Sequence, residues 1–185
     1  YALVKNYLSA NELELIRAEI FSIPNFLEGQ YEGDMPFFKS PSDGVCSLGI
    51  TSALPLTYSK TVHNEELLSL ARALYGGEVK LTASAALNKF DANANDSSNI
   101  PHWDDWRVRL KAFIYLTDVD RHTAPTIYFK GSVNHVPWRF EKDYCSVFMS
   151  QEAVAGGSWW PVNKLGLEKI TLEGAAGTLV VFDAR

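Results

Sequence analysis

Residues 108–117 read VRLKAFIYLT, and this run decides the fold class. Its β-branched and aromatic residues are typical of a strand. Runs of the same character recur along the chain, separated by turn residues, at 79–90, 126–129, 144–149, 169–172 and 178–182. Several short strands joined by loops, with no helices between them, predict an antiparallel sandwich or jelly roll.

The first helix is predicted close to the N-terminus. Ser9 and Glu12 have the spacing of a capping box, in which each side chain bonds to the backbone N–H of the other residue. Apolar residues then recur at helical spacing, at Leu13, Ile16 and Ile20. Pro24 is expected to end this amphipathic helix.

A second helix is predicted from Asn64, as its N-cap, to the pair Gly76-Gly77. The residues expected on its buried side are Leu67, Leu68, Ala71 and Leu74. Residues 25–60 hold Gly, Pro and scattered aromatics without a sustained period, so they are expected to form loop with short strands. The predicted fold is mainly β, of the α+β class: a jelly roll with flanking N-terminal helices.

The composition indicates one acidic domain. The chain has 185 residues, of which 46% are hydrophobic, enough for a single packed core. A net charge of -5 argues against a broad nucleic-acid surface, which needs clustered Lys and Arg. Arg107, Arg109 and Lys111 are the exception, since their spacing of two directs them to one face of a strand. They either serve an anionic small molecule or are simply solvated.

Cys46 and Cys145 are too few for a disulfide framework, which favours a reducing, cytoplasmic location and leaves one bridge between them open. No apolar run approaches the roughly 20 residues of a membrane span, and the start does not resemble a signal peptide. A soluble protein without a membrane partner is expected. The absence of an initiator Met before Tyr1 indicates a processed or incompletely represented chain.

The tripeptide His102-Trp103-Asp104 stands just ahead of the run at 108–117. In an extended segment residues i and i+2 point to the same face, so this imidazole and carboxylate can converge on one metal ion. They would supply two-thirds of the 2-His-1-carboxylate set that holds non-haem iron for oxygen chemistry. His63 and His122 are weaker candidates for the third ligand, because they fall at a helix cap and in a turn.

Three blocks of sequence together resemble the phytanoyl-CoA dioxygenase family. Residues 101–104, PHWD, look like its metal-binding H-x-D motif. Residues 110–120, LKAFIYLTDVD, with 124–126, APT, and 130–132, KGS, are similar to its strand, acidic turn and "Gly-Pro…Pro-Gly-Ser-His" segment. Residues 174–185, GAAGTLVVFDAR, look like the strand that leads to its distal histidine. The likeness covers roughly the last half of the chain, and Ala124 and Val133 depart from the family's Gly and His.

The family consists of iron(II)- and 2-oxoglutarate-dependent oxygenases built on a double-stranded β-helix. The resemblance therefore implies Fe(II) held by His102 and Asp104, 2-oxoglutarate as cosubstrate, O2, and a small-molecule substrate that is hydroxylated. Asp104 favours hydroxylation over halogenation, because the halogenases of the family lack this carboxylate.

In the family, the distal histidine and the arginine that clamps 2-oxoglutarate follow the segment that ends here at Arg185. Three readings stay open. Residues 1–185 form a single oxygenase-like domain that lacks its C-terminal strands, which is favoured because a jelly roll ending here would expose a sheet edge. Alternatively His135 completes the site, or the site is degenerate and binds without oxidising.

Residues on alternate strand positions are expected to hold 2-oxoglutarate, and the candidates are Asn88, Tyr115 and Thr126. Tryptophans are expected to line the substrate pocket: Trp103 and Trp106 beside the metal ligands, and Trp160 as a lip for an apolar or sugar-like substrate. The alternative for both groups is that they are ordinary strand and core residues.

Two other functions compete with a dioxygenase. The first is a non-catalytic jelly-roll binding module, for carbohydrate for example, that keeps remnants of a metal site. The second is a metal-dependent cupin-like enzyme of another class, ranked last because cupins usually carry more clustered metal-binding histidines.

Overall fold

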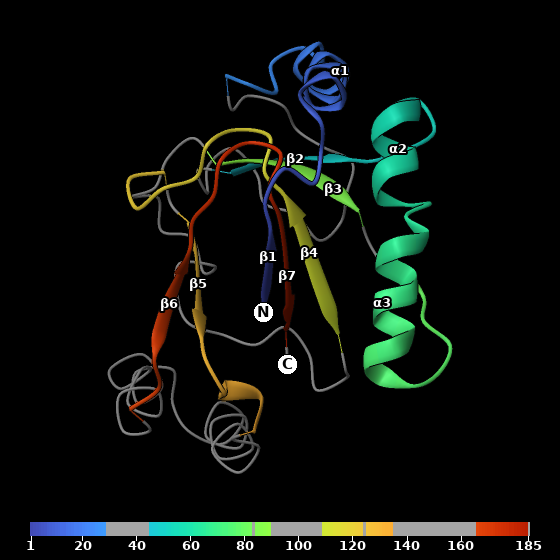
Figure 1. Ribbon diagram of the computed structural model, residues 1–185. Helices are drawn as coiled ribbons and strands as arrows, with labels where there is room; N and C mark the ends of the chain where they lie inside the picture. The colour runs from blue at the N-terminus through green and yellow to red at the C-terminus, as the bar shows by residue number, and fades with distance from the viewer. Residues whose placement is uncertain (29–44, 83, 90–108, 124, 135–165, 185) are drawn as a thin grey trace, which may run out of the picture.

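The computed structural model describes residues 1–28, 45–82, 84–89, 109–123, 125–134 and 166–184 (Figure 1). The helices in these ranges are α1 (Ala10–Phe21), α2 (Pro55–Thr61), α3 (Glu65–Tyr75) and a 3-10 turn (Ser132–Asn134). The strands are β1 (Ala2–Val4), β2 (Val45–Gly49), β3 (Ala85–Lys89), β4 (Leu110–Ile114), β5 (Thr126–Phe129), β6 (Lys169–Leu172) and β7 (Leu179–Asp183).

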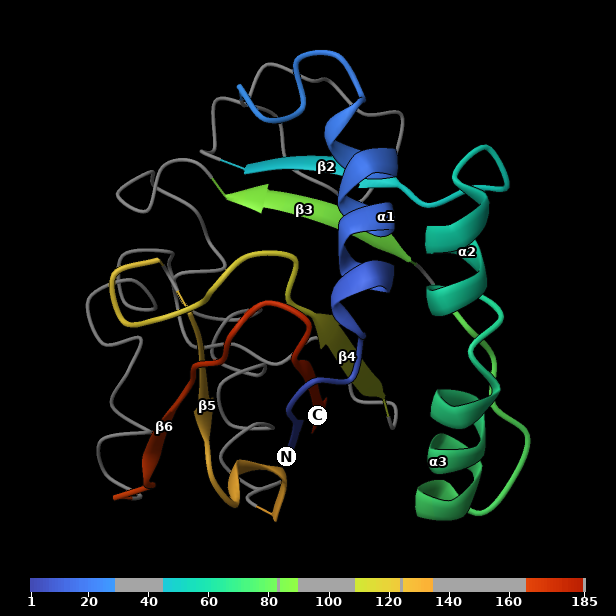
Figure 2. The same cartoon turned by 45° about the horizontal axis from the view of Figure 1, so that its top comes forward.

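The strands pair only with antiparallel neighbours among the described residues. β7 lies between β1 and β4, β2 pairs with β3, and β5 pairs with β6. The sheet β5-β6 lies on one side of the sheet β1-β7-β4, and helices α2 and α3 lie on the other (Figures 1 and 2). The protein is thus a mixed α and β structure with several antiparallel sheets.

The first core forms beneath α1. Leu13, Ile16 and Ile20 are buried there, as the helical spacing predicts. They pack with Leu48 of β2 and Ala86 of β3, so α1 covers one face of the sheet β2-β3. The backbone N–H of Leu8 donates to the carbonyl of Gly177 over 3.1 Å, and the Arg17 Nε donates to the carbonyl of Leu116 over 2.6 Å. These two bonds attach α1 to the ends of β7 and β4.

The second core lies between the sheets β1-β7-β4 and β5-β6. Leu172 and Val180 are fully buried in it. The other members are Tyr115, Phe182 and Ala184, with Phe113, Val119, Tyr128 and Ile170 packed against them. Successive strand residues point to opposite faces, so alternate residues of β4 and β7 contribute to this core while the residues between them face away from it.

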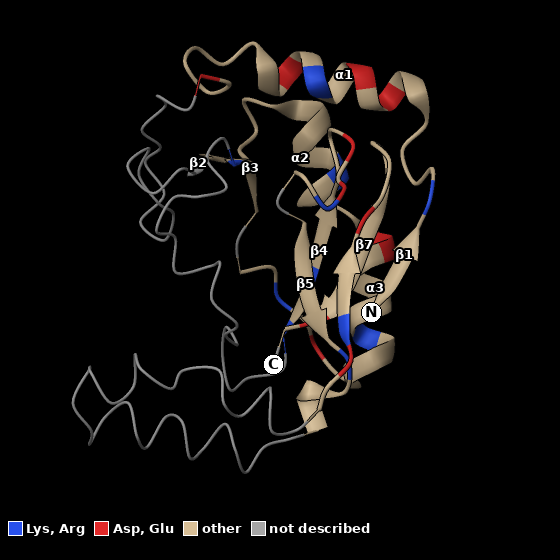
Figure 3. Ribbon diagram, turned by 90° about the vertical axis from the view of Figure 1, so that its left-hand side faces the viewer, with Lys and Arg blue, Asp and Glu red and all other residues tan. Residues whose placement is uncertain are grey.

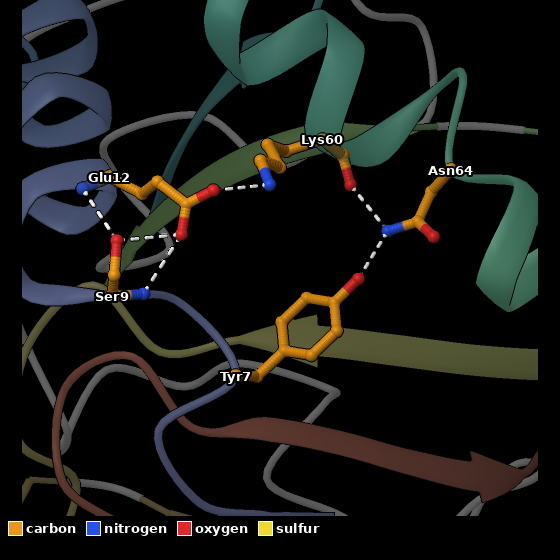
Figure 4. Close-up of polar contacts among 5 residues, drawn as sticks. All are labelled: Tyr7, Ser9, Glu12, Lys60 and Asn64. Carbon is orange, nitrogen blue, oxygen red and sulfur yellow. Dashed lines mark hydrogen bonds and ion pairs between the residues drawn. The ribbon is translucent and has the colours of Figure 1, made fainter.

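The capping box of α1 is present as predicted. The Glu12 N–H donates to the Ser9 Oγ, and the Ser9 N–H donates to the Glu12 carboxylate over 2.9 Å. The same carboxylate forms an ion pair with Lys60 of α2 over 2.5 Å (Figure 4). The bond from Lys60, followed by the bonds from Ser9, lowers the pKa of Glu12 to about 2. A capping residue that is readable from sequence therefore also ties α1 to α2.

Helix α2 lies in the stretch 25–60 that was expected to be loop with short strands, so that expectation is wrong for residues 55–60. Pro55 stands in the first turn, where a missing N–H costs nothing. The cap comes from α1: the Glu19 carboxylate accepts bonds from the Leu56 N–H, the Thr57 N–H and the Thr57 hydroxyl, over 2.7–2.9 Å. A side chain that is distant in sequence thus caps α2, whose own N-cap residue, Leu54, provides no side-chain hydrogen bond.

Helix α3 has the predicted ends. The Asn64 side chain accepts from the Leu67 N–H over 3.1 Å, and Gly76 adopts the left-handed conformation with φ +67°. The Asn64 amide also donates to the Tyr7 hydroxyl over 2.7 Å (Figure 4). The predicted buried side is wrong in part, because Ala71 is buried but Leu74 is 58% exposed. Helix α3 lies at the outer edge of the view in Figure 1 and behind the strands in Figure 3.

The strands at 126–129 and 169–172 are confirmed. β4 lies inside the predicted run 108–117, and β7 is shifted by one residue from the predicted run 178–182. The run at 79–90 was predicted too long at its start, because the described residues 79–82 and 84 are outside the strand and the register of β3 with β2 begins at Ala85 opposite Gly49. The predicted strand at 144–149 lies outside the described residues. β1 was not predicted, and it exists because β7 offers it an edge.

Candidate functional site

The predicted metal ligands His102 and Asp104 lie outside the described residues, as do His135 and the three pocket tryptophans, Trp103, Trp106 and Trp160. The structure does describe β4, which follows the metal motif in the sequence, and β7, the last described strand. Their pairing fixes where the segments attached to them begin.

β4 and β7 are antiparallel neighbours, with Leu110 opposite Asp183 and Ile114 opposite Leu179. The pairing continues beyond the strands, since the Ala184 N–H donates to the carbonyl of Arg109 over 2.9 Å. The start of β4 and the end of β7 therefore lie side by side at one end of the sheet. Any chain leaving this end of β7 starts next to Arg109 and the beginning of β4.

Tyr115 and Thr126 come together around Leu172. The Tyr115 hydroxyl donates to the Leu172 carbonyl over 2.6 Å, and Thr126 is the register partner of Leu172. Burial raises the pKa of Tyr115, so the phenol keeps its proton. Because that single proton is given to Leu172, the hydroxyl cannot also donate to a carboxylate unless this bond is exchanged.

Asn88 lies elsewhere, on β3. Its side-chain amide donates to the carbonyls of Phe26 and Leu27, over 2.8 and 3.1 Å, which uses both of its N–H groups. The residue therefore anchors the chain that follows α1. The role of Asn88, Tyr115 and Thr126 in holding 2-oxoglutarate stays a prediction, and for Asn88 and Tyr115 it requires these bonds to open.

Two basic residues, Lys111 of β4 and Arg109 just before the strand, lie on the side of the second core. Lys111 is directly opposite Phe182, and residues directly opposite in an antiparallel pair share a face. Phe182 belongs to the second core and is 8% exposed. Arg109, two residues before Lys111 and bonded to Ala184, continues the same alternation. Arg107 lies outside the described residues. The spacing of two predicted the common face but did not show that it is the face between the sheets.

The other described histidines have local partners. The ring of His63 stacks edge-on against Tyr58 with centroids 5.0 Å apart. His122 lies in a turn where its N–H donates to the Asp120 carboxylate over 2.8 Å, which lowers the pKa of Asp120. Its Nε2 accepts from the Arg121 Nε over 3.1 Å. Within the described ranges, no three His, Cys, Asp or Glu side chains are grouped so that they could hold a metal ion.

Comparisons with models of protein families, with curated proteins and with solved structures give no match to this chain. In the described part of the chain, no helix combines the length and apolar character needed to cross a bilayer.

Proposed function

We propose that this protein is an iron(II)- and 2-oxoglutarate-dependent dioxygenase of the jelly-roll type that hydroxylates a small molecule. The observation that carries the proposal is the pairing of β4 with β7. It brings the segment after the H-x-D motif and the end of the last described strand to one end of the sheet. A metal site assembled from both segments needs this neighbourhood.

Two antiparallel sheets that face one another across a shared core support the jelly-roll part of the proposal. Val180 and Phe182 give this core an apolar wall, from which water is excluded. The bond from Tyr115 to Leu172 holds the facing sheets together beside that wall. A dry, rigid interior beside the ligands is what controlled oxidation requires, since it limits reaction with bulk solvent.

His102 and Asp104 would hold the iron, with a third ligand from a histidine beyond Arg185 or, as the weaker choice, from His135. Bound iron would supply the activation of O2 that is coupled to oxidation of the 2-oxo acid. Trp103, Trp106 and Trp160 would restrict the substrate's access and orientation.

The proposal is tested on the complete protein by thermal unfolding under anaerobic conditions, with Fe(II) and 2-oxoglutarate added together. We expect Tm to rise, because a ligand that binds only the folded state stabilises it by mass action. His102→Ala and Asp104→Ala should abolish the rise. His122→Ala is the matched control, since this histidine has its own partners in a surface turn, and it should respond like the unchanged protein.

A complete protein whose Tm does not respond to iron and 2-oxoglutarate would contradict the dioxygenase. Ligand binding that persists in Asp104→Ala, without any effect of iron, would instead favour the non-catalytic binding module.

A further inference from the structure

The face of β4 that points between the sheets changes character along its length. Phe113 and the following Tyr115 lie in the second core, and their alternation places Lys111 and Arg109 on the same face nearer the start of the strand. The register confirms this placement for Lys111, which lies opposite the buried Phe182. Two cations therefore continue an aromatic wall toward the end of the sheet where β4 begins.

The surroundings of these cations are largely apolar. The rings of Phe113 and Phe182 are in edge contact, with centroids 5.3 Å apart, and Tyr128 of the facing sheet lies 5.8 Å from Phe182. On β5 and β6, the positions that share the face of the second core are Thr126, Tyr128, Ile170 and Leu172. Asp183 is opposite Leu110 and so belongs to the other face of its sheet. The described strands thus bring no carboxylate to this face.

A carboxylate is the group that such an arrangement recognises. Attraction between opposite charges strengthens where water is partly excluded, and a guanidinium can bind both oxygens of a carboxylate at once. Arg109 and Lys111 are each partly buried and partly accessible to solvent. Both residues also make other interactions within the chain, so a bound anion would add to these or replace them.

We propose that Arg109 and Lys111 hold the carboxylate of a small, partly apolar substrate, whose apolar part lies against Phe113 and Phe182. The subsite is at the end of the sheet where β4 begins, and the H-x-D motif precedes β4 in the sequence. A small, partly apolar carboxylic acid is thus the substrate class for the proposed function. Its binding does not depend on that function, but its hydroxylation does.

Binding is measured by calorimetry without iron, using benzoate, phenylacetate and hexanoate as probes and the corresponding uncharged amides as controls. At least one acid should bind, and its amide should bind more weakly. Arg109→Gln and Lys111→Gln should each lower the affinity for the acid by about ten- to hundredfold, which corresponds to the loss of one charge-assisted hydrogen bond. Lys130→Gln is the matched control, because Lys130 forms an exposed pair with Glu168 over 3.1 Å, and it should change nothing.

Arg109→Lys and Lys111→Arg keep the charge and should retain most of the affinity, which separates loss of the subsite from loss of folding. Failure of all three acids to bind, or equal binding by acid and amide, would overturn the proposal. So would an affinity that is unchanged in both glutamine variants.

A second arm distinguishes the substrate from the cosubstrate. Benzoate, or whichever acid binds best, is titrated in the presence of saturating 2-oxoglutarate. Independent binding supports a substrate subsite, whereas competition assigns the two cations to 2-oxoglutarate and overturns the proposal. Because neither measurement uses iron, the acid can still bind when the Tm of the unchanged protein does not respond to Fe(II) and 2-oxoglutarate, and the two proposals can fail separately.

Discussion

The hydroxyl of Tyr115, the residue that follows β4, donates a 2.6 Å hydrogen bond to the carbonyl of Leu172 on β6, 57 residues further along the chain. Leu172 is fully buried and Tyr115 is 9% exposed, so little water reaches this bond. The bond crosses from one sheet to the other and fixes their separation at the second core.

Tyr115→Phe removes only the donor and keeps the ring. We expect the free energy of unfolding to fall by about 1–3 kcal/mol, because the Leu172 carbonyl is left buried without its partner. Urea unfolding measures this loss. Tyr1→Phe, at a ring that is 53% exposed, is the control and should change stability by less than about 0.5 kcal/mol. Equal stability of the two variants would mean that the bond between the sheets contributes nothing.

Among the glycines in the described ranges, Gly177 is the one whose replacement should be most costly. Its φ of +83° is one that side chains rarely adopt, and an added Cβ would lie 3.1 Å from the carbonyl oxygen of Leu8. Gly177→Ala should therefore destabilise the protein by at least about 1 kcal/mol, through backbone strain and a disturbed contact between β7 and the start of α1.

Gly77→Ala is the matched control, because no atom lies within 4 Å of a Cβ placed there and its φ is not in the left-handed range. It should leave the melting temperature unchanged or raise it slightly. A comparable loss in both variants would show that the contact between Gly177 and Leu8 is not what matters.

Glu19 makes the joint between α1 and α2 sensitive to acid. Partial burial alone would raise its pKa, but the bonds from the Thr57 hydroxyl, the Thr57 N–H and the Leu56 N–H outweigh it, so the pKa is lowered below 4.5. A carboxylate with a lowered pKa in the folded state contributes stability above about pH 4.5, and this contribution is lost as the pH falls through the folded-state value.

Glu19→Gln should thus cost about 1 kcal/mol at neutral pH, in the range of lost helix caps, and the difference from the unchanged protein should shrink in acid. Chemical unfolding between pH 3 and 7 measures both effects. Glu14→Gln, at a side chain that is 69% exposed and forms an ion pair with Arg17, should follow the unchanged protein across that range. A gap that is constant with pH would show that the charge of Glu19 has no part in capping.

The helix ends of α1 and α3 could be predicted because Ser9, Glu12 and Asn64 act on backbone groups three residues away. Helix α2 could not be, since its cap is supplied by Glu19, 37 residues before Leu56. Residue spacing predicts a cap when both partners are close in sequence. A cap that comes from another helix becomes visible only in the folded structure.

The candidate site divides in the same way. The pair His102 and Asp104 is readable from spacing alone, and their metal-binding role stays a prediction. That Lys111 faces the second core depends on its being opposite Phe182, which only strand register reveals. The donors of Asn88 are used by the carbonyls of Phe26 and Leu27, more than 60 residues away, and no sequence pattern marks that bond.

The end of the sheet where β4 and β7 meet should control metal binding. Ala184→Pro removes the N–H that bonds to the Arg109 carbonyl, while Ala184→Gly keeps it. If the proposed site is assembled across this pair, the rise in Tm caused by Fe(II) with 2-oxoglutarate should shrink strongly in the proline variant and persist in the glycine variant. Each rise is measured against the same variant without ligand, which removes the direct effect of the substitution on folding. A full rise in Ala184→Pro would contradict a metal site that depends on the two strands being paired here, and would direct attention to His135 as the source of the third ligand.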